Sequence, residues 1–185
     1  MLYLENHDHP RILPRYGSEI FWKQSGKMLA ACYLFQQGTP FVYQGQEIGM
    51  PAAHYDSIDD FDDVESLGAY RKYIEKMPEK NAVEKINFGS RDNARHPMAW
   101  DGSEKSGFTI GEPWLITHSR AKEVNVENDL SSNKSVYRFY QEVLRLRASN
   151  DVFADGKFEV VSRQNDDFFV YTRTLGDEKW AVVCN

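Results

Sequence analysis

The chain has few cysteines, no long apolar run and no cluster of basic residues. Cys32 and Cys184 are its two cysteines, and their separation matches neither a metal site nor a redox pair. We therefore expect two reduced thiols in a core. No apolar stretch approaches the length that crosses a bilayer, and the N-terminus lacks the basic and apolar regions of a signal peptide. These absences favour a cytoplasmic location and argue against a membrane partner.

The charge balance argues against a nucleic-acid partner. Lys and Arg number 22 against 28 Asp and Glu, which gives a net charge of -6, and the basic residues form no run. Proteins that bind phosphate backbones need clustered positive charge. What the chain does contain is 41% hydrophobic and 14% aromatic residues over 185 positions, enough for one globular domain or for one domain and part of a second.

Two polar motifs each follow a predicted strand. Residues 2–4 (LYL) are predicted to end a buried strand, apolar spacing predicts a helix over 21–35, and TPFVYQG (39–45) is typical of a second strand. Strand, helix, strand order favours parallel strands, whose carboxyl ends gather reactive groups at one edge. The motifs ENHDHPR (5–11) and QGQEIGM (44–50) are both expected at that edge.

After the second motif, the sequence predicts loops and helices up to about residue 150 and strands beyond it. The acidic segment 52–66 is predicted to be a long loop that leads into a helix ending near Pro78. Residues 87–120 lack a period, whereas apolar residues from Ser135 recur at the spacing of a packed helix. After Asn150, three β-branched and aromatic runs separated by SRQNDD and TLGDEK predict an antiparallel meander.

Several polar and aromatic residues of the irregular segments suit a sugar-binding cleft. A lone pair such as His7 and Asp8 after a strand is more often a hydrogen-bonded loop pair than a site. The context favours chemistry because carboxylates and guanidinium groups can bridge adjacent sugar hydroxyls beside aromatic platforms. The candidate residues for such a cleft are Glu47, Glu65, Arg91, Arg95, Trp100 and Trp114.

Each of these residues has a purely structural alternative. Trp100 and Trp114 can pack under the long loop, Arg91 and Asp92 can form a local ion pair of little energetic weight, and Glu47 can accept hydrogen bonds from backbone groups. The histidines show no ligand spacing on a predicted helix, so no metal site is expected.

Four motifs in series carry a family resemblance. YLENHDHPR, GTPFVYQGQEIGM, SRDNARHPMAWD, and GFTIGEPWL with VNVE resemble the α-glucosidase branch of the α-amylase superfamily, glycoside hydrolase family 13. That branch contains oligo-1,6-glucosidases, dextran glucosidases and trehalose-6-phosphate hydrolases. The resemblance implies an α/β fold, a (β/α)8 TIM barrel followed by a small antiparallel domain. Residues 1–150 would be the C-terminal portion of the barrel, and 151–185 the truncated start of the β domain.

The resemblance also implies roles for individual residues. Asp8 would be the third carboxylate of the site, which holds the hydroxyls at carbons 2 and 3 of the sugar, and His7 would hydrogen-bond the same sugar. Arg95 would grip the non-reducing end, with Arg91 as the alternative for that role. Glu65 would line the neighbouring subsite that selects α-1,6 linkages. No cofactor is implied.

Departures and absences limit what the resemblance implies. The family usually has Gln at His9, Glu at Gln46, Thr at His96 and Gln at Ala99, which affects fine specificity. Retaining glycosidases need a nucleophile and an acid/base carboxylate about 5 Å apart, and the family supplies both from earlier barrel strands.

The chain alone is therefore expected to be inactive, with an oligosaccharide substrate and either the missing N-terminal barrel portion or another copy as partners. Three alternatives stay open: a non-catalytic carbohydrate-binding or structural relative, a transglucosylase, and a sucrose isomerase.

Overall fold

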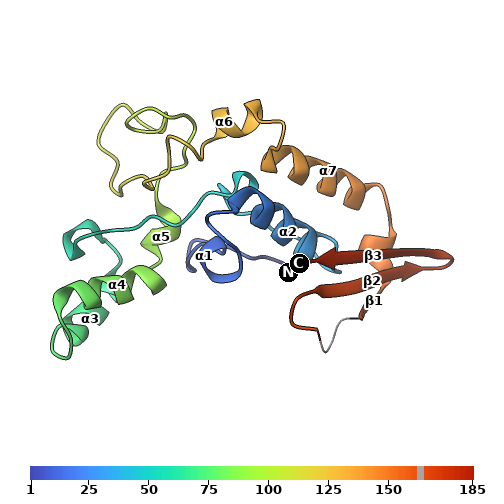
Figure 1. The fold of residues 1–185 in the computed structure, drawn as a ribbon, viewed down its shortest axis with the longest axis horizontal. Coiled ribbons are helices and arrows are strands. Elements are labelled where there is room, and N and C mark those ends of the chain that lie inside the picture. Colours follow the sequence, from blue (N-terminus) through green and yellow to red (C-terminus); the bar gives the residue numbers. More distant parts are fainter. Residues whose placement is uncertain (162–164) are drawn as a thin grey trace.

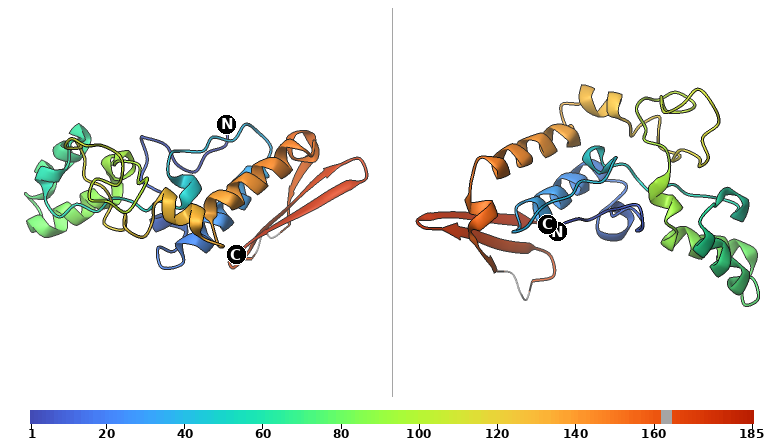
Figure 2. Two further views of the ribbon diagram at one scale, coloured as in Figure 1. Left: turned by 90° about the horizontal axis from the view of Figure 1, so that it is seen from above. Right: turned by 180° about the vertical axis from the view of Figure 1, so that it is seen from behind.

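The protein is described by a computed structural model over residues 1–161 and 165–185; the start of the turn predicted over 162–167 lies outside these residues. The molecule is elongated. Helices α3 and α4 lie at one end, a three-stranded sheet lies at the other, and α2 and α7 run side by side between them (Figures 1 and 2). None of the described helices is long and apolar enough to cross a membrane.

The helices and strands confirm most of the predicted periodicity. Predicted helices over 21–35, after the acidic loop and from 135 appear as α2, α3 and α7. The element bounds are α1 Leu13–Tyr16, α2 Trp22–Leu34, α3 Val64–Tyr73, α4 Glu79–Gly89, α5 Asp92–Arg95, α6 Val126–Ser131, α7 Val136–Ala148, α8 Val152–Asp155, β1 Lys157–Val160, β2 Phe169–Leu175 and β3 Glu178–Cys184, with 3-10 turns η1 at Gln46–Ile48 and η2 at Ile58–Asp60.

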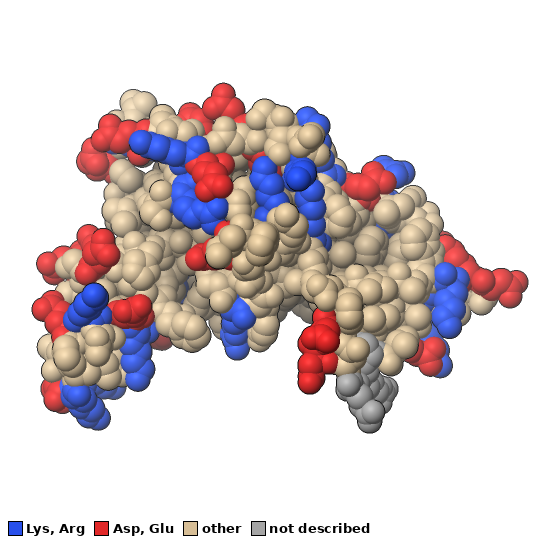
Figure 3. Space-filling view, viewed as in Figure 1, with Lys and Arg blue, Asp and Glu red and all other residues tan. Residues whose placement is uncertain are grey.

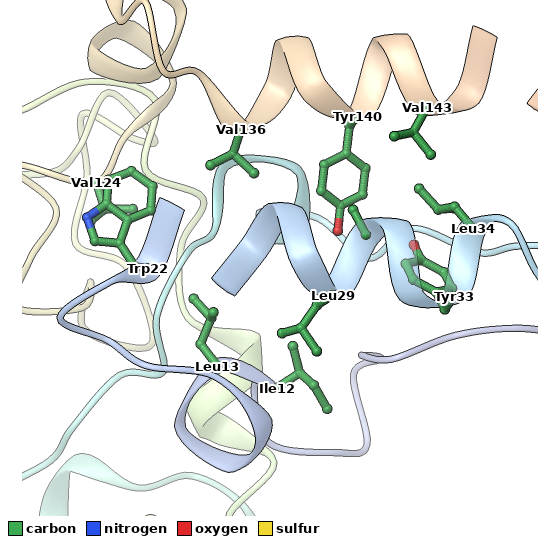
Figure 4. Close-up of a cluster of buried hydrophobic side chains, with 11 residues drawn as sticks. Ile12, Leu13, Trp22, Leu29, Tyr33, Leu34, Val124, Val136, Tyr140 and Val143 are labelled. Atoms are coloured by element: carbon green, nitrogen blue, oxygen red, sulfur yellow. The ribbon is translucent and has the colours of Figure 1, made fainter. Parts of the chain in front are cut away.

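The main core lies between α2, α7 and the first loop (Figure 4). Leu29 of α2 packs with Ile12 and Leu13, and Val136 and Tyr140 of α7 project toward α2. This packing follows from the apolar stripes of both helices, because each stripe must be removed from water against another element. The core therefore fixes the loop that precedes α1 against α2.

The start of α7 is capped by two polar side chains. Ser135 accepts a hydrogen bond from the backbone N–H of Arg138 at 3.0 Å. The buried Asp129 carboxylate accepts from the Ser135 hydroxyl at 2.6 Å and from the backbone N–H of Val136 and Tyr137 at 3.0 Å each. These bonds satisfy donors that a helix N-terminus leaves without partners, so α7 begins at a defined residue.

The first and second predicted strands meet only once. Leu2 and Pro40 form an isolated parallel bridge, in which the Leu2 N–H donates to Thr39 O and the Phe41 N–H donates to Leu2 O, both at 2.8 Å. The parallel direction is as predicted. The prediction of a strand over 39–45 is wrong, because only Pro40 of that segment forms the bridge. The backbone turns at Gly45, whose φ of 83° favours glycine, and this turn ends the extended segment.

The C-terminal strands form the predicted antiparallel meander in the order β1-β2-β3. Tyr171 of β2 pairs with Val182 of β3, and its hydroxyl donates to the carbonyls of Ala31 and Cys32 in α2 at 3.2 and 3.0 Å. Cys184 is buried in the apolar cluster around Tyr171, and the partly buried Cys32 packs against it, so both cysteines lie in a core as predicted. The sheet is thus attached to α2.

The surface carries both signs of charge. On the face seen in Figure 3, Lys and Arg alternate with Asp and Glu around a wide uncharged area. Mixed charges produce no strong field of one sign over this face.

Candidate functional site

The loop between the Leu2 bridge and α1 is pinned at both ends and exposed in the middle. Asn6 forms the turn, since its side chain accepts a hydrogen bond from the Asp8 N–H at 2.8 Å. Glu5 and Arg11 are almost fully buried and form an ion pair of 2.9 Å. Glu5 also accepts from the Ile12 N–H at 2.8 Å. The buried ends therefore hold an exposed turn in a defined position.

The exposed turn places Asp8 among three basic side chains. Its Oδ1 lies 3.0 Å from Nη2 of Arg95 and 3.8 Å from Nη1 of Arg91. Its Oδ2 lies 3.3 Å from Nε2 of His7, and the Asp8 side chain is 51% exposed. Exposed ion pairs contribute only about 0–1 kcal/mol to stability. The structure thus brings the four predicted residues His7, Asp8, Arg91 and Arg95 together.

Arg95 is oriented by two contacts with the same turn. Its Nε donates to the carbonyl of His7 at 2.7 Å while Nη2 binds Asp8. A guanidinium held at two points is a preorganised fork of donors. Arg95 ends the short helix α5 and thereby joins the segment 91–96 to the exposed turn.

Arg91 connects Asp8 to the acidic loop. Its Nε donates to Oδ1 of Asp63 at 2.9 Å, and its Nη2 also binds that oxygen. The same Nη2 lies 3.9 Å from Oε1 of Glu65. Burial would raise the pKa of Asp63, but hydrogen bonds from Ser66 and Arg91 outweigh it and lower the pKa below its usual value. Asp63 therefore stays ionised and holds Arg91, while Glu65 stays largely exposed at the rim.

The structural alternative, a local ion pair between Arg91 and Asp92, is wrong. Asp92 is buried, and its carboxylate accepts from the backbone N–H groups of Asp62 and Asp63 at 2.8 and 2.7 Å. It caps the turn that leads into α3. Asp63 was missed as the true partner of Arg91 although it precedes α3 as an N-cap, a pattern that singles out an acidic residue with a fixed side chain.

Of the remaining candidates, the two tryptophans depart from their structural alternative and Glu47 agrees with it. Trp100 and Trp114 are 52% and 63% exposed, so the alternative that they pack under the loop is wrong. Glu47 accepts backbone hydrogen bonds, and burial raises its pKa. Within the described ranges, no group of three or more His, Cys, Asp or Glu side chains has the arrangement of a metal site.

Two of the positions that depart from the family pattern are buried polar residues. Gln46 donates through its amide to the hydroxyls of Tyr33 and Tyr140 at 3.2 and 3.0 Å, which ties the second loop to α2 and α7. His96 is fully buried and its ring lies edge-on to that of His118, with centroids 5.2 Å apart. His9 is exposed and stacks on Tyr3.

The buried histidines predict acid-sensitive stability. Burial lowers the pKa of His118 from 6.5 to about 4, with help from Arg11 and Arg120. The unfolded chain therefore binds more protons between these pH values, and stability is full above pH 6.5 and declines as the pH falls. Between pH 7 and pH 5, the free energy of unfolding should fall by about 2 kcal/mol more in the wild type than in His118→Asn. Urea unfolding at the two pH values measures this difference.

The matched control is His54→Asn, which changes an exposed histidine and should keep the acid sensitivity of the wild type. Equal acid sensitivity of the wild type and His118→Asn would show that His118 protonates as readily in the folded chain as in the unfolded one.

Comparison with known proteins assigns the family. Residues 1–156 match the family model described as Alpha amylase, catalytic domain. The chain belongs to the α-amylase family, which confirms the resemblance that the four motifs indicated. It is 41% identical over 187 aligned residues to the oligo-1,6-glucosidase of Parageobacillus thermoglucosidasius, covering 100% of this chain and 33% of that protein.

Solved structures agree with this assignment. The trehalose-6-phosphate hydrolase of Bacillus licheniformis superposes with a TM-score of 0.94 at 38% identity, over 98% of this chain and 33% of that one. The trehalulose synthase of Pseudomonas mesoacidophila MX-45 superposes with a TM-score of 0.92 at 36% identity, with the same coverage. The chain thus spans about a third of the length of the curated relatives it matches.

Proposed function

We propose that this chain supplies the sugar-gripping part of a retaining α-glucosidase that hydrolyses α-glucosidic bonds, α-1,6 bonds among them, in short oligosaccharides. The observation that carries the proposal is the half-exposed Asp8 carboxylate with His7, Arg91 and Arg95 around it. The names of the relatives, an oligo-1,6-glucosidase and a trehalose-6-phosphate hydrolase, support an α-glucoside as the substrate.

The chemistry of the site suits this role. Asp8 accepts hydrogen bonds from the hydroxyls at carbons 2 and 3, and its negative charge favours the oxocarbenium-like ring as the bond breaks. Arg95 and Arg91 present guanidinium donors to sugar oxygens, and Glu65 at the rim faces the neighbouring subsite. In the proposed reaction the nucleophile and the acid/base are carboxylates outside this chain, and water completes the hydrolysis.

A substrate panel tests the proposed function. The full-length protein should hydrolyse isomaltose and release glucose of retained α configuration. This chain alone should show no rate above background. A full-length protein that binds isomaltose without cleaving it would favour a non-catalytic carbohydrate-binding relative, and would contradict the proposal.

The similarity to a trehalulose synthase supports a second candidate function, that of a sucrose isomerase. The hydrolase structure and the synthase structure each cover 98% of this chain, so the fold of this chain is common to both kinds of enzyme. Product analysis with sucrose separates them. Free glucose and fructose support the hydrolase, whereas an isomeric disaccharide as the main product supports a sucrose isomerase.

We further propose that residues 1–150 form the C-terminal portion of a (β/α)8 barrel and that 151–185 begin an antiparallel domain. The parallel Leu2–Pro40 bridge, the family match that ends at residue 156 and the separate meander support this division. A cytoplasmic location accords with the free cysteines.

The exposed apolar side chains near the parallel bridge predict association of this chain. Tyr3, Phe41 and Val42 are 44%, 49% and 40% exposed. An apolar edge of this kind is covered in the proposed barrel by the N-terminal portion, and in this chain alone by a second copy. Light scattering should therefore give a mass above 21.4 kDa for this chain alone. A monomer at micromolar concentration would contradict this expectation.

A further inference from the structure

Arg11 is a buried cation beside the site that makes no contact with Asp8. Its side chain is fully buried, and Nη1 lies 2.9 Å from the equally buried Glu5 carboxylate. Burying a charge is costly unless it is paired and hydrogen-bonded. The guanidinium also donates to two backbone carbonyls, which lie in two other segments of the chain.

These carbonyls belong to the segments that surround Asp8. Nη1 of Arg11 donates to Gln44 O at 2.7 Å, and Nη2 donates to Ala94 O at 3.3 Å. Ala94 immediately precedes Arg95, and Ala94 O also accepts from the Tyr43 hydroxyl at 3.2 Å. The Arg11 guanidinium itself lies over the Tyr43 ring, 5.0 Å from its centroid. One planar cation thus joins the Asp8 turn, the extended segment that ends at Gly45, and helix α5.

This junction sets the position of Arg95 relative to Asp8. The Asp8 turn is anchored by Glu5 and Arg11, while α5 is anchored through Ala94 O to the same guanidinium. Arg95 itself meets the Asp8 turn through two contacts near the surface, with the Asp8 carboxylate and with the His7 carbonyl, and an exposed ion pair contributes little energy. A lysine at position 11 could keep the charge opposite Glu5, but its single ammonium lacks the planar fork that spans both carbonyls.

We propose that Arg11 is a positioning residue. Its buried guanidinium binds Glu5, Gln44 O and Ala94 O, and these bonds set the geometry of Asp8 and Arg95. The inference rests on the proposed function, because its kinetic consequence appears only where Asp8 grips the hydroxyl at carbon 2. Arg11 acts on that grip and does not touch the sugar.

The test compares Arg11→Lys with Arg173→Lys in the full-length protein. Arg173 is also fully buried and donates to three backbone carbonyls, those of Phe35, Phe153 and Gly156, at 2.7 to 2.8 Å. It lies in β2, away from the site. Both variants are therefore expected to lose stability, whereas only Arg11→Lys is expected to lose the positioning of Asp8 and Arg95 as well.

The kinetic readout is the ratio of kcat/KM for an aryl α-glucoside to that for its 2-deoxy analogue. Arg11→Lys should lower this ratio at least tenfold, because a displaced Asp8 no longer distinguishes the two sugars. Arg173→Lys should leave the ratio within twofold of the wild type. Equal losses on both substrates in Arg11→Lys would reduce Arg11 to a structural residue and overturn the proposal.

A crystallographic readout does not depend on activity. The Arg95 to Asp8 contact, 3.0 Å in the wild type, should be lost in Arg11→Lys and kept in Arg173→Lys. If the wild type cleaves no α-glucoside, the proposed function fails, and the structures alone decide whether Arg11 positions the pair. If Arg11→Lys does not fold, Glu5→Gln replaces it, with the same expected loss of the contact and of discrimination; retention of both would overturn the proposal.

Discussion

Asp8→Asn in the full-length protein should lower kcat/KM on an aryl α-glucoside on the order of a thousandfold. The amide keeps the size of the side chain but removes the negative charge that favours the oxocarbenium-like ring, and one well-placed electrostatic group contributes roughly this factor. The hydrogen bond from Arg95 also loses its charged acceptor. Steady-state kinetics on the purified variant measure the effect.

The matched control for Asp8→Asn is Asp177→Asn, the same chemical change at the exposed turn between β2 and β3. It should leave kcat/KM unchanged. Retention by Asp8→Asn of more than a tenth of the wild-type kcat/KM would exclude Asp8 from the reaction and leave it as a loop residue.

Arg11→Met should lower the free energy of unfolding by about 3–5 kcal/mol, because it leaves the Glu5 carboxylate buried without a partner. The change also frees the carbonyls of Gln44 and Ala94 from a charged donor. Urea or guanidinium denaturation monitored by circular dichroism gives the difference. The double variant Glu5→Leu/Arg11→Met should recover part of the loss, since it removes both charges together.

Arg145→Met is the control for a surface arginine. Arg145 is exposed and pairs with the exposed Glu142 at 2.6 Å, so its loss should change stability by no more than about 1 kcal/mol. A similar small change in Arg11→Met would mean that Glu5 is not held as a buried ion, and that the turn carrying Asp8 keeps its position without the pair.

The periodicity of apolar residues in the sequence predicted helices α2, α3 and α7 and the C-terminal strands. The apolar stripe over α7 predicted that helix because five apolar residues recur on one face, and the alternating runs after Asn150 predicted the meander. Helix α4 was missed because its buried face is only Ala82, Val83 and Ile86 in a charged segment. The predicted strand over 39–45 shortened to a bridge because a glycine turn follows directly.

The sequence predicted which residues gather around Asp8, but not which residues hold them in place. His7 and Asp8 were recognised from one motif, and Arg91 and Arg95 from another, through a family resemblance that later comparison confirmed. Their supports depend on long-range contacts: Asp63 binds Arg91 across 28 positions, and Arg11 binds Ala94 O across 83. No local period encodes such pairs, so only the folded structure places them.

The role of Asp8 is tested most directly by a crystal structure of the full-length protein with a glucose-derived inhibitor bound. Both carboxylate oxygens should lie about 2.5–3.0 Å from the hydroxyls at carbons 2 and 3 of the sugar, with Arg95 still in contact with Asp8. A sugar bound with those hydroxyls on other residues, and Asp8 engaged only by its arginines, would contradict the assignment of this cluster as the sugar-gripping site.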